Sequence, residues 1–528
     1  MKMLKRLLML VVFVGILFNT ATAANLVQVY EQALASDPVY QQAIAQRFAT
    51  NEDVPINMAP LLPQAGISGG PLYNKNHVSG IADSSALTSS AHGYSFTLAL
   101  SQTVFNYAQF KALAGAKATG RQADASLNAA TQDLMLRVAN AYFAVLKDED
   151  NLRYNLANKK AFGKQLDQIN QQYKVGLKTV TDLYTSQSSY DTAAADYIAA
   201  ETALANDNEN LRAITGTLYP SLARLSENFP LITPEPADMN AWVETAERQN
   251  WSIKAAQFAN RAALENIKQQ SAGHYPTVSL QGSYNVAYSN TVDNGTANAP
   301  SLIPINSANG TLLPGASHTT NATVSLNLGV PIFQGGLVTA QTNQAKYNYQ
   351  LTTQQLEQQV RTTINNTRQS YLGIILGIKQ IQADKEAIKS TTSSYGGLHE
   401  GYRVGTQTLV DVLNQQQKVF LAQTQYATDR YAYVYNLLKL KQAAGTLSVD
   451  DLQAINAWLK DDEESIQDDS IQRDAYAPIR HARKSYHHAK NKKVIPLEPH
   501  PIAIAKANPI NASLNQHLGN SPDLSLSP

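Results

Sequence analysis

The residue types that most often carry enzyme chemistry are absent from this sequence or scattered along it. The 528 residues include no cysteine and ten histidines. Without cysteine there is no disulfide scaffold, cysteine nucleophile, cysteine-ligated metal or lipidated N-terminal cysteine. The sequence also has no H-E-x-x-H motif and no P-loop. We therefore predict that the protein is not an enzyme, that it uses no cofactor and that it binds no catalytic metal.

Three histidines, His481, His487 and His488, lie close enough in the sequence to be considered as metal ligands. They belong to a segment, residues 461–528, that begins with an acidic run, continues with a basic run and ends rich in Pro, Asn and Ser. Such a composition favours a solvated, disordered tail over a metal site.

A motif that occurs twice places carboxylates close to tight turns. The segment Tyr173-Lys174-Val175-Gly176 recurs 229 residues later as Tyr402-Arg403-Val404-Gly405, and Asp182 recurs at the same offset as Asp411. The chain therefore contains two copies of one structural unit. A carboxylate just after a turn often caps the helix that follows, and this interpretation of Asp182 and Asp411 stays open beside a functional one.

Long helices must position these turns. Prolines are absent from Leu72 to Tyr219 and from Ile332 to Ala477, and both windows are rich in strong helix formers. In the first copy we expect a helix over 105–172, about 100 Å long, and a shorter one over 181–215. A helical segment over 26–59, with breaks at Asp37-Pro38 and Pro55, would match the long helix in length if it stacked end to end on the shorter one.

Between the helices the apolar residues alternate, as they do in strands with one apolar face. Four segments show this pattern, 65–73, 94–101, 278–288 and 324–330. Their lengths, about 8 to 12 residues, suit membrane-spanning strands, although a half-buried soluble sheet has the same pattern. The connecting segments, 74–93 and 289–322, are long and polar, which favours the membrane.

Four strands are too few to close a membrane barrel, and an open edge in lipid leaves backbone groups unsatisfied. Two or three chains must therefore share one barrel, and a trimer would provide 12 strands. We predict an α+β membrane protein whose barrel continues into a long, hollow bundle of helices.

The N-terminal segment and the charge balance indicate the compartment. Residues 1–23 have basic residues, then an apolar run, then small residues, as expected of a cleaved signal peptide. The whole chain has 42 Lys and Arg against 41 Asp and Glu, a net charge of +1, which argues against a nucleic-acid partner.

At this point the sequence resembles the TolC family of outer-membrane efflux and secretion channels, in its branch without a lipidated cysteine. The resemblance runs from Asn25 to about Leu459. Its motifs are Leu61-Leu62-Pro63-Gln64, the two Tyr-x-Val-Gly turns, Thr181-Asp182, Val410-Asp411-Val412-Leu413, Pro331-Ile332-Phe333-Gln334-Gly335-Gly336 and Ala444-Gly445-Thr446-Leu447.

The resemblance implies a homotrimer with a 12-stranded barrel in the outer membrane of a Gram-negative bacterium and an α-helical barrel in the periplasm. Such a protein is the exit duct of a tripartite efflux pump or a type I secretion system. Its partners are outer-membrane lipid, a periplasmic adaptor (membrane fusion) protein and an inner-membrane RND, ABC or MFS transporter. An exported coiled-coil protein without a pore remains the alternative.

Motifs and resemblance together divide the chain as follows. After the signal peptide come repeat 1 over 24–218 with a β-hairpin at about 64–104, an equatorial linker over 219–240, repeat 2 over 241–447 with a β-hairpin at about 277–331, an equatorial segment over 448–460 and the tail over 461–528.

The resemblance also assigns roles to residues around the turns. Asp411 occupies the position of a carboxylate ring at the periplasmic entrance, and Asn414 stands where a second aspartate is usual. A latch that holds the entrance closed maps to Tyr402, Thr181 and Asp182, with Gln407 in place of the usual arginine. Because Lys178 is the repeat equivalent of Gln407, it could supply the missing cation. The turn residues Tyr173, Val175, Gly176, Tyr402, Val404 and Gly405 are expected to contact the adaptor.

Overall fold

The structure is a computed structural model that describes residues 23–78, 87–293 and 315–460. The expected signal peptide lies outside the described residues except for Ala23. So do the expected tail, 461–528, with its three histidines, and the central parts of both segments that connect the strands.

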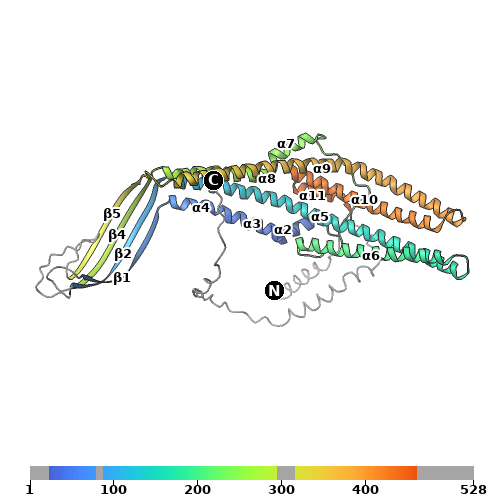
Figure 1. Cartoon of the computed structure of the whole chain (residues 1–528), viewed down its shortest axis with the longest axis horizontal. Coiled ribbons are helices and arrows are strands. Elements are labelled where there is room, and N and C mark those ends of the chain that lie inside the picture. Colours follow the sequence, from blue (N-terminus) through green and yellow to red (C-terminus); the bar gives the residue numbers. More distant parts are fainter. Residues whose placement is uncertain (1–22, 79–86, 294–314, 461–528) are drawn as a thin grey trace, which may run out of the picture. The chain divides into compact units, whose positions relative to one another are not determined.

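The two copies of the repeat have the same order of elements, except that the first has three helices before its 3-10 helix and the second has two (Figure 1). The first contains α2 (Leu26–Ser36), α3 (Pro38–Asn51), α4 (Asp53–Met58), η1 (Ala59–Leu61), β1 (Gln64–Val78), β2 (Leu87–Asn106), α5 (Tyr107–Lys174) and α6 (Val180–Thr215). The second contains α7 (Met239–Gln249), α8 (Trp251–Ser271), η2 (Ala272–His274), β4 (Thr277–Asp293), β5 (Gly315–Gly329), α9 (Leu337–Arg403) and α10 (Leu409–Ala444). The short strand β3 (Arg224–Leu225) lies between the two copies, and α11 (Val449–Asn456) and β6 (Leu459–Lys460) follow the second.

The helix expected over 105–172 is α5, which runs unbroken for 68 residues, and its counterpart α9 runs for 67. Each is followed by a helix of 36 residues, α6 or α10. Both shorter helices end at a glycine with positive φ, Gly216 at 69° and Gly445 at 75°. Glycine adopts this left-handed conformation without a Cβ penalty, so it ends a helix well.

Two details of the N-terminal helical segment differ from the prediction. The second break falls at Glu52, not at Pro55, because Pro55 occupies the first turn of α4, where a missing N–H costs no hydrogen bond. In addition, α6 ends beside Ser36, whose hydroxyl donates to the Thr215 carbonyl at 2.7 Å. Because α2 contacts both α5 and α6, only α3 and α4 extend beyond α6 along α5. The predicted stacking of the whole segment 26–59 on the shorter helix was therefore wrong.

The strands form one antiparallel sheet in the order β1-β2-β4-β5. They have 15, 20, 17 and 15 residues, so the predicted lengths of 8 to 12 were too short. The alternation of apolar residues stops before the strands do. Backbone ladder bonds continue through the polar residues that follow, since they do not depend on the side chain.

One face of this sheet is apolar over most of its height. Opposed pairs include Tyr94 with Tyr288, Phe96 with Val286, Leu98 with Tyr284, Ile67 with Leu98 and Leu280 with Leu326. Serine, threonine, asparagine and alanine dominate the alternate positions on the other face. A register shift between Thr103 and Phe105 changes the phase of β2 and places Phe105 opposite Val278, on the apolar face. The bulge thereby extends the apolar face to the start of α5.

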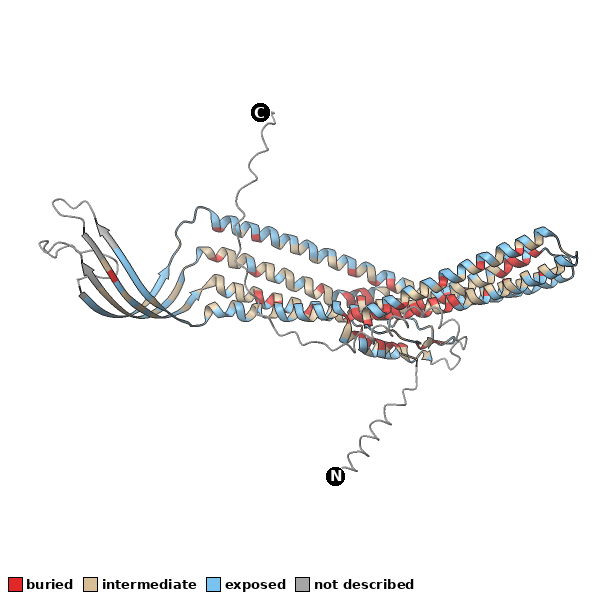
Figure 2. Cartoon of the chain, turned by 90° about the horizontal axis from the view of Figure 1, so that it is seen from below, coloured by how far each residue is buried: buried red, intermediate tan, exposed pale blue. Residues whose placement is uncertain are grey.

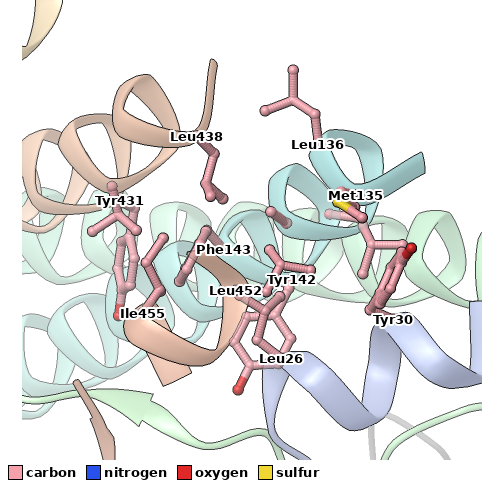
Figure 3. Packing of buried hydrophobic residues seen from close by; sticks show 14 of the residues in the cluster. Leu26, Tyr30, Met135, Leu136, Tyr142, Phe143, Tyr431, Leu438, Leu452 and Ile455 are labelled. Carbon is pink, nitrogen blue, oxygen red and sulfur yellow. The ribbon is translucent and has the colours of Figure 1, made fainter. Parts of the chain in front are cut away.

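The main hydrophobic core lies far from the sheet along the helices, where α2, α5, α10 and α11 meet (Figure 3). Leu26, Tyr142 and Leu452 are fully or almost fully buried there. Figure 2 shows buried residues concentrated in this region and in the two helical hairpins, whereas the sheet is largely exposed. Among the described residues, the hydrophobic core thus lies in the helical part.

The core also holds the two segments expected at the equator. Strand β3 pairs with β6, and the Tyr142 hydroxyl donates to the Ala223 carbonyl at 2.6 Å. Arg430 of α10 is buried and donates to the carbonyl of Leu225 at 2.9 Å. Backbone groups of these irregular segments are therefore satisfied by side chains of α5 and α10.

Candidate functional site

The two turns that join the long and short helices have the same backbone geometry. In the first turn the Gly176 N–H donates to the Tyr173 carbonyl at 2.9 Å, and in the second the Gly405 N–H donates to the Tyr402 carbonyl at 3.1 Å. Both glycines have positive φ, 76° and 83°. In each turn the next N–H bonds back to the residue before the tyrosine, which completes a Schellman motif. The repeated Tyr-x-Val-Gly sequence is therefore a helix stop signal.

The helices that follow the turns also start alike. Thr179 and Thr408 are the N-cap residues, and each side chain accepts a hydrogen bond from the aspartate N–H three residues later. In return, the Asp182 carboxylate accepts from the Thr179 N–H at 3.1 Å, and the Asp411 carboxylate accepts from the Thr408 N–H at 3.3 Å. Both are capping boxes. Helix capping is thus one role of both aspartates in the single chain.

A small second core holds the two hairpins together near the turns. Its buried members are Phe162, Ile169, Ala193, Leu409 and Leu413, and Tyr402 packs against them. The start of α10 lies inside this core, whereas the start of α6 contributes only the partly buried Leu183.

Two predicted latch residues, one from each turn, meet in the structure. The Lys178 ammonium lies 4.5 Å from the centroid of the Tyr402 ring, a cation–π distance. The Tyr402 hydroxyl is buried and has no hydrogen-bond partner. It makes no bond to Asp182, whose carboxylate bonds to Thr179. The structure therefore brings Lys178 to Tyr402 but does not join Tyr402 to Asp182.

The expected entrance residues share one exposed row on α10. Asp411 and Asn414 are both exposed and lie one turn apart. The sequence reasoning missed Lys418, which is exposed and continues the same row one further turn along. The spacing of 411, 414 and 418 could have identified it, because residues three and four apart share a helix face. Along this row the side chains thus change from acidic to neutral to basic.

The remaining predicted residues lie at the surface of the turns. Thr181 and Gln407 are exposed, and the Gln407 N–H donates to the Gly401 carbonyl at 3.3 Å. Val175 and Val404 are 70% and 68% exposed, and Leu177 beside them is 73% exposed. Tyr173 is exposed as well, at 40%. The ends of the hairpins thus present apolar side chains to solvent.

The described part of the chain contains no cluster of metal ligands, and its one hydrolase-like motif does not have the backbone geometry of an active site. In that part, no group of three or more histidine and carboxylate side chains could hold a metal ion. The sequence does contain the G-x-S-x-G spacing of hydrolases, at Gly66 to Gly70. Ser68, however, lies inside β1 opposite Thr97, whereas a nucleophile elbow requires a sharp strand-to-helix turn.

Comparison with known proteins decides the family. The family model for the outer membrane efflux protein matches residues 29–217 and 242–446, which is more than half of the chain. The chain belongs to the outer membrane efflux protein family. It is 37% identical to the outer membrane protein TolC of Escherichia coli strain K12 over 443 residues, which cover 83% of this chain and 85% of TolC.

More distant relatives and solved structures agree with this assignment. The alkaline protease secretion protein AprF of Pseudomonas aeruginosa is 25% identical over 460 residues, covering 84% of this chain and 89% of AprF. The crystal structure of the Campylobacter jejuni CmeC outer membrane channel has the same fold. Its TM-score is 0.66 at 15% identity, covering 83% of this chain and 90% of CmeC.

Membership of the outer membrane efflux protein family settles the location and the broad class. The protein is an outer membrane protein of a Gram-negative bacterium, and its family is one of channels rather than enzymes. Among the described helices, none is both long enough and apolar enough to span a bilayer.

Proposed function

We propose that this protein is the outer-membrane exit duct of a tripartite efflux pump or a type I secretion system. The observation that carries the proposal is the four-stranded sheet, whose apolar face is exposed in the single chain. On that face Ile67, Val324 and Leu328 are 79%, 80% and 67% exposed. A sheet with one apolar and one polar face suits a barrel wall between lipid and a watered channel.

The unpaired edges of the chain support a trimer with a shared 12-stranded barrel. Strands β1 and β5 are the edges of the sheet, and an open edge in lipid is unsatisfied. Next to the sheet the helical part has edges too, because there the contacts order the helices as α3 and α4, then α5, α8 and the first part of α9. Both helical edges expose large apolar residues, Phe48 and Ile56 on one side and Tyr347 and Leu351 on the other. The edges of the sheet and of the helical part would therefore both pack against the neighbouring chain.

A polar hollow among the helices supports a watered interior for the proposed α-helical barrel. An open cavity of about 480 Å³ is lined by residues of α4, α5, α8 and α9, among them Asp53, Asn57, Asn266, Gln269 and Asn348. Four neighbouring helices contribute to it, as they would on the concave side of a curved wall. The amide and carboxylate groups there favour water over lipid.

For the paired turns we propose a gate with a ring of Asp411 and Asn414 at its aperture. The contact between Lys178 and Tyr402 supports the view that Lys178 replaces the cation that Gln407 cannot supply. Thr181 and Asp182 would complete the latch with residues of a neighbouring chain, since the Tyr402 hydroxyl has no hydrogen-bond partner in the single chain. Exposed Val175 and Val404, with Tyr173 and the turn glycines, would contact the adaptor and hence the inner-membrane transporter.

The decisive experiment combines assembly with conductance. Native mass spectrometry of the full-length protein in mild detergent should show a trimer, and the same preparation should form ion channels in planar bilayers. A trimer that never conducts would favour the exported coiled-coil alternative. A folded monomer would contradict the shared barrel.

A further inference from the structure

A buried carboxylate lies among three cations just beyond the sheet. Glu265 of α8, whose side chain is 5% exposed, forms ion pairs with Lys268 at 2.8 Å, Lys111 at 3.3 Å and Arg261 at 3.4 Å. Burial alone would raise the pKa of Glu265, but hydrogen bonds from Lys268 and Lys111 and their charges outweigh it, so the pKa is lowered. We call these four residues the cation cluster. With three cations and one ionised carboxylate, its net charge is +2.

The cation cluster has more positive charge than the packing of its helices needs. Lys111 of α5 joins Glu265 of α8, so this pair alone links the two helices. Arg261 and Lys268 belong to the same helix as Glu265, at a spacing of four and three residues. The salt bridges of the described residues provide no second carboxylate for any of the three cations. Arg261 and Lys268 are also accessible, with side chains 61% and 36% exposed.

The cation cluster lies on the side of the helices that continues the apolar face of the sheet. Phe105, at the end of that face, contacts Phe110 of α5, with ring centroids 6.2 Å apart. Tyr107 packs on Tyr275 at 5.1 Å, and the Lys111 ammonium lies 5.2 Å from the Tyr107 ring centroid. An aromatic patch therefore connects the apolar face to the cations.

The polar cavity lies on the opposite side of the same helix. Its α8 residues are Ala262, Ala263, Asn266 and Gln269. At 100° per residue, Arg261 and Lys268 point away from the mean direction of these four. The two accessible cations of the cluster thus face away from the cavity, and the cavity faces the proposed channel.

The cation cluster begins at the distance from the sheet that is expected of a lipid headgroup layer. Lys111 lies four residues after the start of α5, or ~6 Å along it, and Lys268 lies three residues before the end of α8, or ~4.5 Å. Glu265 and Arg261 lie six and ten residues before the same end, or ~9 and ~15 Å, and the Arg261 side chain extends to Glu265. The polar layer on each side of a bilayer is about 5 to 8 Å thick. Aromatic residues that border the hydrocarbon, followed by cations at headgroup depth, are the arrangement that anionic lipids recognise.

We propose that the cation cluster binds the phosphate group of an anionic phospholipid in the leaflet next to the helices. Arg261 and Lys268 contact the phosphate, and the acyl chains pack against Phe105, Phe110 and Tyr275. Each chain of the assembly contributes one such site, which fixes the height of the sheet in the membrane. The proposal rests on the membrane-spanning sheet of the proposed function but not on the gate or on transport.

The test is a native mass spectrometry titration of the full-length protein with phosphatidylglycerol and with phosphatidylcholine of the same acyl chains. The wild-type protein should prefer phosphatidylglycerol. Arg261→Gln and Lys268→Gln should each reduce that preference about fivefold, and the double variant should reduce it further, because each cation near an anionic lipid contributes separately. The double variant retains Lys111 and Glu265, so the link between α5 and α8 stays.

Two control variants test whether the lipid preference depends on cations at these two positions or only on the total charge of the protein. Arg361→Gln combined with Lys389→Gln removes two exposed cations of α9 that also pair within their own helix, and it should leave the preference unchanged. Arg261→Lys combined with Lys268→Arg should retain it. An unchanged preference in the double glutamine variant would overturn the proposal. Displacement of the lipid by inorganic phosphate at equal concentration would also overturn it, in favour of a free-anion site.

Conductance measured in phosphatidylcholine bilayers tests the proposed function independently of the lipid site. The double variant should conduct as the wild type does while its lipid preference is reduced. Loss of conductance in the wild type in every lipid would count against the duct, whatever the lipid titration shows.

Discussion

The two helical hairpins end in the same turn but differ in what lies beneath it. Leu409 at the start of α10 is 3% exposed, whereas its repeat equivalent on α6, Val180, is 45% exposed. One turn later Leu413 is 5% exposed and its equivalent Tyr184 is 69% exposed. The turn is thus a local property of the repeated sequence. Whether the following helix is inside or outside depends on the other hairpin.

The two copies also differ in the polar residues of their turns. Lys178 of the first turn reaches across to Tyr402 of the second, while its own equivalent, Gln407, remains at the surface. Because the two turns are in contact, a cation from one copy is enough to pair with the tyrosine of the other. Interactions between the copies, rather than within either, therefore distinguish the two turns.

The largest difference between the hairpins should appear when the inner helix loses its packing. Leu413→Ala should destabilise the tip by about 2 to 5 kcal/mol, because it removes buried methyl groups and leaves a cavity. Tyr184→Ala, at the equivalent exposed position, should cost little. Hydrogen exchange of the backbone amides at the start of α10 and α6 measures both. Equal effects would mean that α6 is buried in the assembly.

The two capping aspartates should differ in their effect on block of the channel by cations. Asp411→Asn should weaken block of the channel by a trivalent cation about tenfold or more, since the exposed ring would lose its carboxylates. Asp182→Asn should leave block unchanged. Both asparagines retain an acceptor oxygen for the cap, so capping does not differ between the variants. Titration of the blocking cation in planar bilayers gives the result, and equal loss in both variants would place the ring elsewhere.

The caps themselves should behave alike in both copies. Thr179→Ala and Thr408→Ala each remove one side-chain acceptor from the first turn of a helix, at a cost of about 1 kcal/mol. The readout is again hydrogen exchange, at the first turns of α6 and α10. Thr→Ser at either position is the matched control and should retain the cap. A clearly larger effect at one turn would mean that one threonine has a second role.

The smallest expected effect concerns the contact between the turns. Lys178→Ala should remove a cation–π contact of about 0.5 to 1 kcal/mol and increase the open fraction of the channel, and Gln407→Ala should do neither. Gln407→Arg should stabilise the closed state. Single-channel recordings measure the open fraction. Because partners in one contact are not independent, adding Tyr402→Leu to Lys178→Ala should have little further effect. Additive effects would show that Lys178 and Tyr402 act separately.

Local regularities were predictable from the sequence. The unbroken helix over 105–172, the stop at each Tyr-x-Val-Gly and the alternation in four strands depend on residues no more than five apart. Hydrogen-bond ladders of helices and the pleat of a strand repeat at that range, so they leave periodic traces in the sequence. The capping interpretation of Asp182 and Asp411 was also available, because it needs only a threonine three residues earlier.

The arrangement of these elements required the tertiary structure. Length alone suggested that residues 26–59 stack on the shorter helix, whereas the position of Ser36 at the end of α6 shows that α2 lies beside it. The strands extend past their apolar residues because backbone pairing with a neighbour continues without them.

Contacts between distant residues account for the rest. Lys178 meets Tyr402 across 224 positions, and Lys111 meets Glu265 across 154. Neither pair follows from any period of the sequence, because the packing of one hairpin against another brings them together. The sequence by itself determined which segments become helices, strands and turns, since short-range hydrogen bonding decides that. Only the tertiary structure decided which side chains face each other, the interior and the solvent, because burial is a property of the assembled helices and sheet.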